Sequence, residues 1–97
     1  MRIFQTDISA TIYLVVERNI IGGRIRQARK AAKPPVTQAD LVARLQILAI
    51  SIDQSALSKI ETGQRPISDI EVLAFAKALK LSVSWLFAES DVDLTAH

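Results

Sequence analysis

The sequence predicts a small all-α domain built from five short helices. Helix-start signals recur four times along the chain, and each one opens a segment whose apolar residues repeat with helical spacing. The chain has 97 residues, which is enough for one domain with one core. Hydrophobic residues make up 49% of the sequence and charged residues 23%, a balance typical of a chain that folds.

Each helix-start signal combines a capping side chain with apolar residues on both sides of it. At the first, Asp40 can reach back to the cap Thr37, and Val36 can pack on Leu41 as a hydrophobic staple. The later caps are Asp53 between Ile52 and Leu57, Ser68 between Ile67 and Val72 with Glu71 as its capping-box acid, and Ser82 between Leu81 and Leu86. Four signals of the same kind predict four helix starts.

Helix ends are also predicted. Pro34 and Pro35 end the first helix, and Gly63 can take the left-handed conformation that closes the third. The helices are therefore predicted near residues 22–33, 38–48, 54–62, 69–80 and 83–88. The predicted core consists of Ile25, Ala28, Leu41, Leu45, Leu48, Leu57, Ile60, Leu73, Phe75, Ala76, Leu79, Trp85 and Leu86.

Residues 1–20 follow a different pattern. Apolar and polar side chains alternate over residues 8–17, many of them β-branched, which predicts a strand. A lone strand leaves backbone groups unpaired, so we expect it to pair with the same strand of a second chain, or with residues 2–5 folded back on it. An additional helix, or an extension without fixed structure, is the alternative. Residues 89–97 are an acidic tail.

The composition argues against an enzyme. The chain has no cysteine, and its one histidine is the terminal His97. No metal-ligand spacing, glycine-rich phosphate loop or paired carboxylates occur, so we expect no catalytic residue, metal or cofactor. The apolar stretch at residues 8–16 is too short to span a bilayer, and a cysteine-free chain is compatible with the reducing cytoplasm.

Positive charge is concentrated near the start of the helical region. Net charge is only +2, yet residues 18–33 carry several arginines and lysines and no acid. Such a cluster favours a polyanionic partner, although ordinary solvated helix charges would look the same.

Five segments share the residue spacing of one known family. They are Ile21-Gly22-x-x-Ile25-Arg26-x-x-Arg29, Thr37-Gln38-x-x-Leu41, Leu57-Ser58-Lys59-Ile60-Glu61-x-Gly63-x-Arg65, Leu73-x-x-Ala76-x-Ala78-Leu79 and Val83-Ser84-Trp85-Leu86. Together they closely resemble the phage Cro/CI-repressor and Xre family over about residues 20–88. The resemblance implies a lambda-repressor-like DNA-binding domain at residues 21–88, flanked by the N-terminal extension at 1–20 and the tail at 89–97.

The resemblance implies that the helix near residues 54–62 is a recognition helix in the major groove. Its candidate base contacts are Gln54, Ser55, Ala56, Ser58, Lys59 and Thr62. Glutamine can pair with adenine, lysine with guanine, and serine with either. The candidate phosphate contacts are Gln38, Gln64, Arg65, Arg24 and Lys30. Arg29 and Glu61 match a family pair that bridges the first and third helices, which implies a structural ion pair.

The sequence departs from the family between Leu45 and Leu57. More residues lie there than the usual tight turn allows, and the glycine expected after the second helix is missing. Residues 46–49 are expected to prolong that helix, with residues 50–52 as a longer connection.

The predicted function is a repressor that binds double-stranded DNA as a homodimer on a palindromic operator. The alternative is a protein-interaction module or an antitoxin, in which the helical bundle or the N-terminal strand binds a partner protein such as a toxin.

Overall fold

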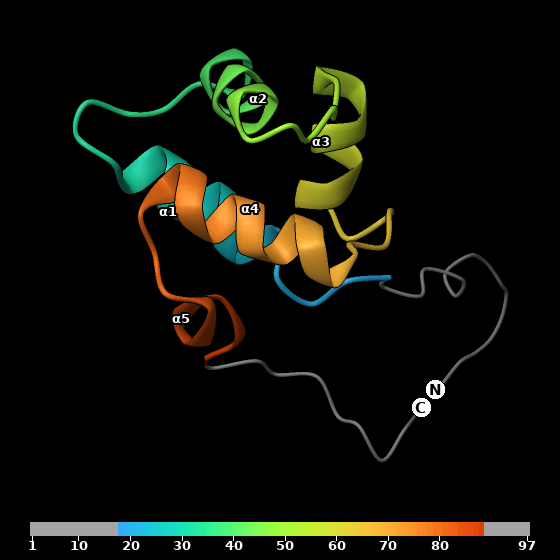
Figure 1. Cartoon of the computed structure of the whole chain (residues 1–97). Coiled ribbons are helices and arrows are strands. Elements are labelled where there is room, and N and C mark those ends of the chain that lie inside the picture. Colours follow the sequence, from blue (N-terminus) through green and yellow to red (C-terminus); the bar gives the residue numbers. More distant parts are fainter. Residues whose placement is uncertain (1–17, 89–97) are drawn as a thin grey trace, which may run out of the picture.

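The computed structural model describes residues 18–88 (Figure 1). The helices in that range are α1 (Gly22–Ala31), α2 (Gln38–Ile47), α3 (Gln54–Glu61), α4 (Asp69–Leu79) and α5 (Val83–Phe87). The predicted all-α class and its five helices are confirmed, with each helix ending one or two residues earlier than expected. The predicted strand at residues 8–17 and the acidic tail lie outside the described residues.

All four predicted caps hold the helix starts. Thr37 Oγ1 accepts a hydrogen bond from the Asp40 N–H at 3.0 Å, and the Asp40 carboxylate accepts one from the Thr37 N–H at 3.2 Å. Ser68 and Glu71 form the same capping box at the start of α4. Asp53 and Ser82 cap α3 and α5. Each cap satisfies backbone donors that the first helical turn leaves unpaired.

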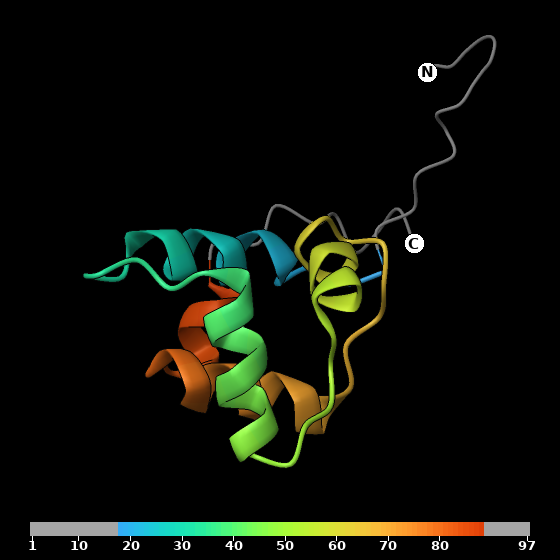
Figure 2. The same cartoon turned by 90° about the horizontal axis from the view of Figure 1, so that it is seen from above.

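The helices enclose a single core. Figure 2 shows α1 and α3 on one side of the domain, with α4 and the C-terminal end of α2 on the other. α3 packs against α1 and α2, whereas α4 packs against α1, α2 and α5. The largest fully buried side chains are Phe75, Ile21, Ile25, Leu41, Leu45, Leu57, Ile60 and Leu86. The helix that carries the candidate base contacts is therefore fixed from two sides.

The prediction of a buried position is wrong for two core residues. Leu48 is 39% exposed because it caps the end of α2, and Leu73 is 50% exposed because α4 buries the face carrying Ala74, Phe75 and Ala78. Three predicted core residues, Ala28, Leu79 and Trp85, are only partly buried. The buried residues absent from the predicted core include Ile21, Val36 and Ile52, which precede helices; Val36 and Ile52 were predicted only as staple residues at their helix starts. Helical periodicity gives no information at such positions.

The connection between α2 and α3 closes around Ala49. The helix continues past Leu45 to Ile47, and Ala49 then takes the left-handed conformation with a φ of 64°. The Ile50 N–H bonds to the Leu45 carbonyl oxygen at 2.9 Å, which is the hydrogen bond of a Schellman cap. Ala49 thus takes the role of the expected glycine. Gly63 and Lys80, with φ of 79° and 57°, close α3 and α4 in the same way.

Replacing Ala49 with glycine should stabilise the domain by about 1 kcal/mol, because a side chain in the left-handed region costs roughly 1 to 2 kcal/mol. Ala43 is the matched control, since it is exposed in the middle of α2 and Ala43→Gly should cost about 1 kcal/mol. Urea unfolding followed by circular dichroism measures both changes. Destabilisation by Ala49→Gly would contradict the strain at Ala49.

Candidate nucleic-acid interface

α3 separates its residues into a buried and an exposed side. Leu57, Ile60 and Glu61 are buried. The exposed positions Gln54, Ser55, Lys59 and Thr62 form what we call the α3 edge. Ala56 and Ser58, also predicted to contact bases, are half-buried beside this edge. The edge offers amide, hydroxyl and ammonium groups, which are the groups that pair with base edges.

Gln38 links the start of α2 to α3. Its Nε2 lies 3.2 Å from both Ser58 Oγ and Glu61 Oε1, and its Oε1 accepts from Gln54 Nε2 at 3.3 Å. The side chain therefore braces α3 at two of its turns. Thr37, the cap before it, places Gln38 at the first position of the helix, where unpaired backbone donors favour an anion.

A buried ion pair joins α1 to α3. Arg29 Nε donates to Glu61 Oε2 at 2.8 Å, and Nη2 donates to Glu61 Oε1 at 2.9 Å. Arg29 Nη1 also donates to the Val36 carbonyl oxygen at 3.1 Å. The hydrogen bond to Glu61 raises the pKa of Arg29, which keeps the guanidinium charged. The ion pair implied by the resemblance is present, and it fixes the rotation of α3 about its axis.

Asn19 and Gly22 form a second connection between α1 and α3, which the sequence analysis missed. Asn19 Oδ1 accepts from the Gly22 N–H at 2.6 Å, while Nδ2 donates to the carbonyl oxygens of Ile60 at 3.0 Å and Arg65 at 2.8 Å. A Cβ at Gly22 would collide with the Ile60 carbonyl oxygen. A glycine three residues after an asparagine was the available signal, but residues 1–20 were interpreted as lying outside the domain.

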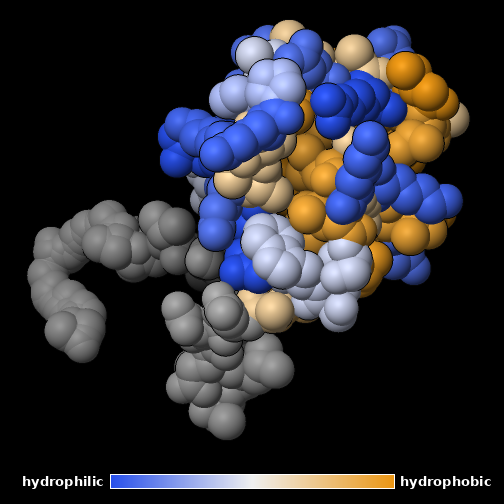
Figure 3. All heavy atoms as spheres, turned by 90° about the vertical axis from the view of Figure 1, so that its left-hand side faces the viewer, coloured by the Kyte–Doolittle hydropathy of each residue, from blue (hydrophilic) through white to orange (hydrophobic). Residues whose placement is uncertain are grey.

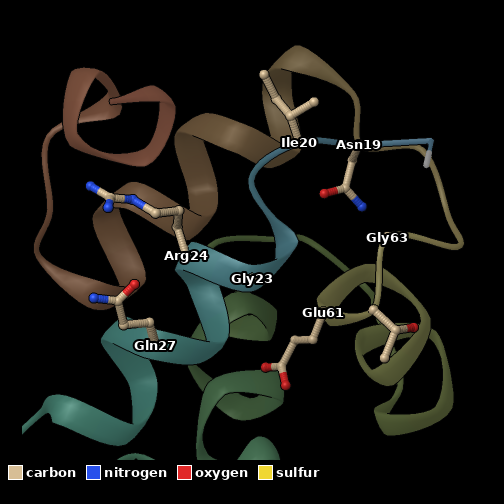
Figure 4. Close-up of a pocket in the computed structure, with 8 residues that line it drawn as sticks. Asn19, Ile20, Gly23, Arg24, Gln27, Glu61 and Gly63 are labelled. Carbon is tan, nitrogen blue, oxygen red and sulfur yellow. The ribbon is translucent and has the colours of Figure 1, made fainter. Parts of the chain in front are cut away.

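The predicted phosphate-contacting Arg24 lies against α5. Its guanidinium carbon is 3.8 Å from the centre of the Trp85 ring, and Nη2 donates to the Trp85 carbonyl oxygen at 2.7 Å. Arg24 also lines a cleft of about 320 Å³ between α1 and the turn after α3, together with Asn19, Gly23 and Gln27 (Figure 4). Arg24 is thus committed in part to joining α1 to α5.

Arg65 has a partner within the domain as well. Its Nη1 and Nη2 each lie 3.2 Å from a carboxylate oxygen of Glu71 at the start of α4. The Arg65 guanidinium lowers the pKa of Glu71, so the pair is ionised at neutral pH. The Arg65 side chain is still 33% exposed, which leaves part of the guanidinium accessible. Gln64, beside it, donates to Thr62 Oγ1 at 3.0 Å.

Comparison with known proteins identifies the family. The family model described as a helix-turn-helix domain matches residues 20–85, which covers α1 to α4 and the start of α5. The chain belongs to the helix-turn-helix domain family. No curated protein and no solved structure matches the chain.

In a helix-turn-helix motif the second helix enters the major groove and the first crosses the backbone. α2 and α3 are consecutive, contacting helices within the matched region, as such a motif requires. The longer connection through Ala49 leaves the two helices in contact and bridged by Gln38. Family membership supports DNA as the partner of this domain.

Among residues 18–88 there is no helix long and apolar enough to cross a membrane. The same part of the chain holds no group of histidine, cysteine, aspartate or glutamate side chains that could ligate a metal ion.

Proposed function

We propose that this protein is a sequence-specific transcriptional repressor of the Cro/CI and Xre type, which acts as a homodimer on a palindromic operator. The observation that carries the proposal is the α3 edge. It consists of four exposed polar side chains on a helix whose opposite side is fixed by the buried Arg29–Glu61 pair. We further infer that it acts in the cytoplasm by binding alone, with no catalysis or cofactor.

The contacts that fix α3 on the side away from the α3 edge favour readout of base sequence over general attraction to a polyanion. The Arg29–Glu61 pair, Asn19 and Gln38 all fix α3; the ion pair is buried, and Asn19 and Gln38 are half-buried. A rigid helix is what sequence readout needs, because hydrogen bonds to base edges depend on placement to a fraction of an ångström. Contacts to phosphates do not need such accuracy.

Selection of bound fragments from random duplex DNA, followed by sequencing, tests the proposal. We expect an enriched site with two-fold symmetry, because a symmetric dimer presents two copies of α3 to the duplex. Affinity should fall steeply with salt, since each neutralised phosphate releases counterions. Absence of duplex binding even at low ionic strength would overturn the proposal.

Changing Lys59 to alanine should weaken binding to the selected operator by about 1 to 3 kcal/mol and relax the base preference at one position. Lys59 is exposed on the α3 edge, and its side chain makes no hydrogen bond or ion pair among the described residues. Fluorescence anisotropy with operator and scrambled duplexes measures the difference.

Arg65→Ala is the comparison variant for this measurement. Because Arg65 lies beside the recognition helix with part of its guanidinium accessible, it should weaken operator and scrambled duplexes about equally. An equal loss on both duplexes for Lys59→Ala would argue against base readout by the α3 edge.

A further inference from the structure

An apolar surface lies on the side of the domain opposite α1 and α3. Ile70 and Leu73 of α4 are 67% and 50% exposed, and Ile47 at the end of α2 is 84% exposed. Between the two helices runs a groove of about 140 Å³, lined by Leu48, Ile50, Ile70, Leu73, Ala74 and Lys77. In Figure 3 the front of the molecule in Figure 1 lies on the right. Hydrophobic surface continues along that side. Exposed apolar areas of this kind mark interaction sites.

The exposed side of α4 carries opposite charges at its two ends. At about 100° per residue, Asp69, Ile70, Leu73 and Lys77 fall within one arc of roughly 100°, and all four are exposed. We call these four residues the α4 face. Asp69 precedes the apolar pair and Lys77 follows it. Neither charged side chain has a hydrogen bond or ion pair within residues 18–88.

This arrangement is complementary to itself. If two α4 helices cross antiparallel at Leu73, the four-residue spacing on either side brings Asp69 of each copy opposite Lys77 of the other. The Ile70 side chains then lie between these pairs, next to the groove beside α2. A two-fold axis requires such self-complementarity, because the same patch serves both subunits.

We propose that the α4 face, in place of the N-terminal strand expected from the sequence, is the surface through which two copies of this chain form the homodimer. The surface does not overlap the DNA-binding edge. It lies beside the C-terminal end of α2, whereas Gln38 and the brace on α3 lie at the N-terminal end, roughly 15 Å away along a ten-residue helix. The α4 face and the α3 edge can therefore each be occupied without blocking the other.

This inference rests on the dimer of the proposed function, and it is tested without DNA. Sedimentation velocity of the full chain over a range of concentrations measures the dimer dissociation constant. Asp69→Lys and Lys77→Glu should each raise it about tenfold or more, because each places like charges opposite one another. The double variant Asp69→Lys/Lys77→Glu should return it close to the original value, because the pairs are restored with reversed polarity.

Two further variants complete the test. Leu73→Glu places a charge at the centre of the interface and should leave a folded monomer, because the side chain is half exposed and not needed for the core. Lys33→Glu makes the same charge change as Lys77→Glu at an exposed position before α2 and should leave the dimer intact.

The outcomes separate the dimer surface from DNA binding. A monomer at every concentration, or a dimer unaffected by Leu73→Glu and both single charge reversals, would overturn the α4 interface. Restoration by the double charge reversal would support it. Binding of the Leu73→Glu monomer to a half-site duplex reports on the recognition helix alone, so loss of the dimer with retained half-site binding leaves the proposed DNA contact standing.

Discussion

Replacing Gly22 with alanine should reduce the free energy of unfolding by about 2 to 3 kcal/mol, the upper part of the usual cost of overpacking a core. The added Cβ would collide with the backbone carbonyl oxygen of Ile60 and crowd the Asn19 side chain. A flexible side chain could turn away, but a backbone carbonyl cannot. Either α1 or α3 must shift.

Gly22→Ala should also weaken binding to the operator. The loss of affinity should be larger than the increase in unfolded protein alone would cause. Ile60 lies in α3, one residue after Lys59, so a shift that relieves the collision also displaces the α3 edge. Asn19 would lose its geometry at the same time, since its amide donates to the Ile60 carbonyl oxygen and its Oδ1 accepts from the Gly22 N–H.

Gly23 provides the matched control. It is the next residue in α1, it is exposed, and an added Cβ there meets nothing within 4 Å. Gly23→Ala should leave DNA affinity unchanged and stabilise the helix by up to about 1 kcal/mol. Urea unfolding and anisotropy on the same preparations compare the two variants. Equal effects from Gly22→Ala and Gly23→Ala would refute the close approach of α1 to α3.

The sequence predicted best where a feature depends on neighbouring residues. A cap and its staple lie within a few positions of each other, so Thr37, Asp53, Ser68 and Ser82 could be recognised without knowledge of the fold. The gross division of α3 into a buried side at Leu57 and Ile60 and a polar edge also followed from helical periodicity.

Features that depend on distant segments were harder to predict. Leu73 was placed in the core because its spacing fits a helix stripe, but the packing of α4 selects a neighbouring stripe centred on Phe75. Asn19 binds backbone atoms more than forty residues away, and the glycine three residues after it does not indicate which distant segment it contacts. Arg24 and Arg65 were predicted only as phosphate contacts, because Trp85 and Glu71 approach them only in the folded chain.

Breaking the Arg29–Glu61 pair by changing either residue to methionine should destabilise the domain by about 3 to 5 kcal/mol. Both side chains are buried, with exposed fractions of 9% for Arg29 and 2% for Glu61. Removing one partner leaves a charge without compensation in the core. Arg65→Met is the matched control, because it breaks an Arg–Glu pair whose arginine is 33% exposed and should cost at most about 1 kcal/mol.

The double variant Arg29→Met/Glu61→Met decides whether the large cost comes from the unpaired charge. It removes both charges and should be more stable than the sum of the single changes predicts, by several kcal/mol, because no buried charge remains. Additive losses in urea unfolding would mean that the two side chains stabilise the fold independently.

DNA binding should nevertheless remain weak in the double variant. Glu61 accepts from Gln38 Nε2 at 3.2 Å as well as from Arg29, so its removal weakens the brace between α2 and α3 even where the core is repaired. Regained stability with persistent loss of operator affinity would assign the pair the role of orienting the recognition helix. Operator affinity that recovers together with stability would instead show that a folded core alone sets the position of α3.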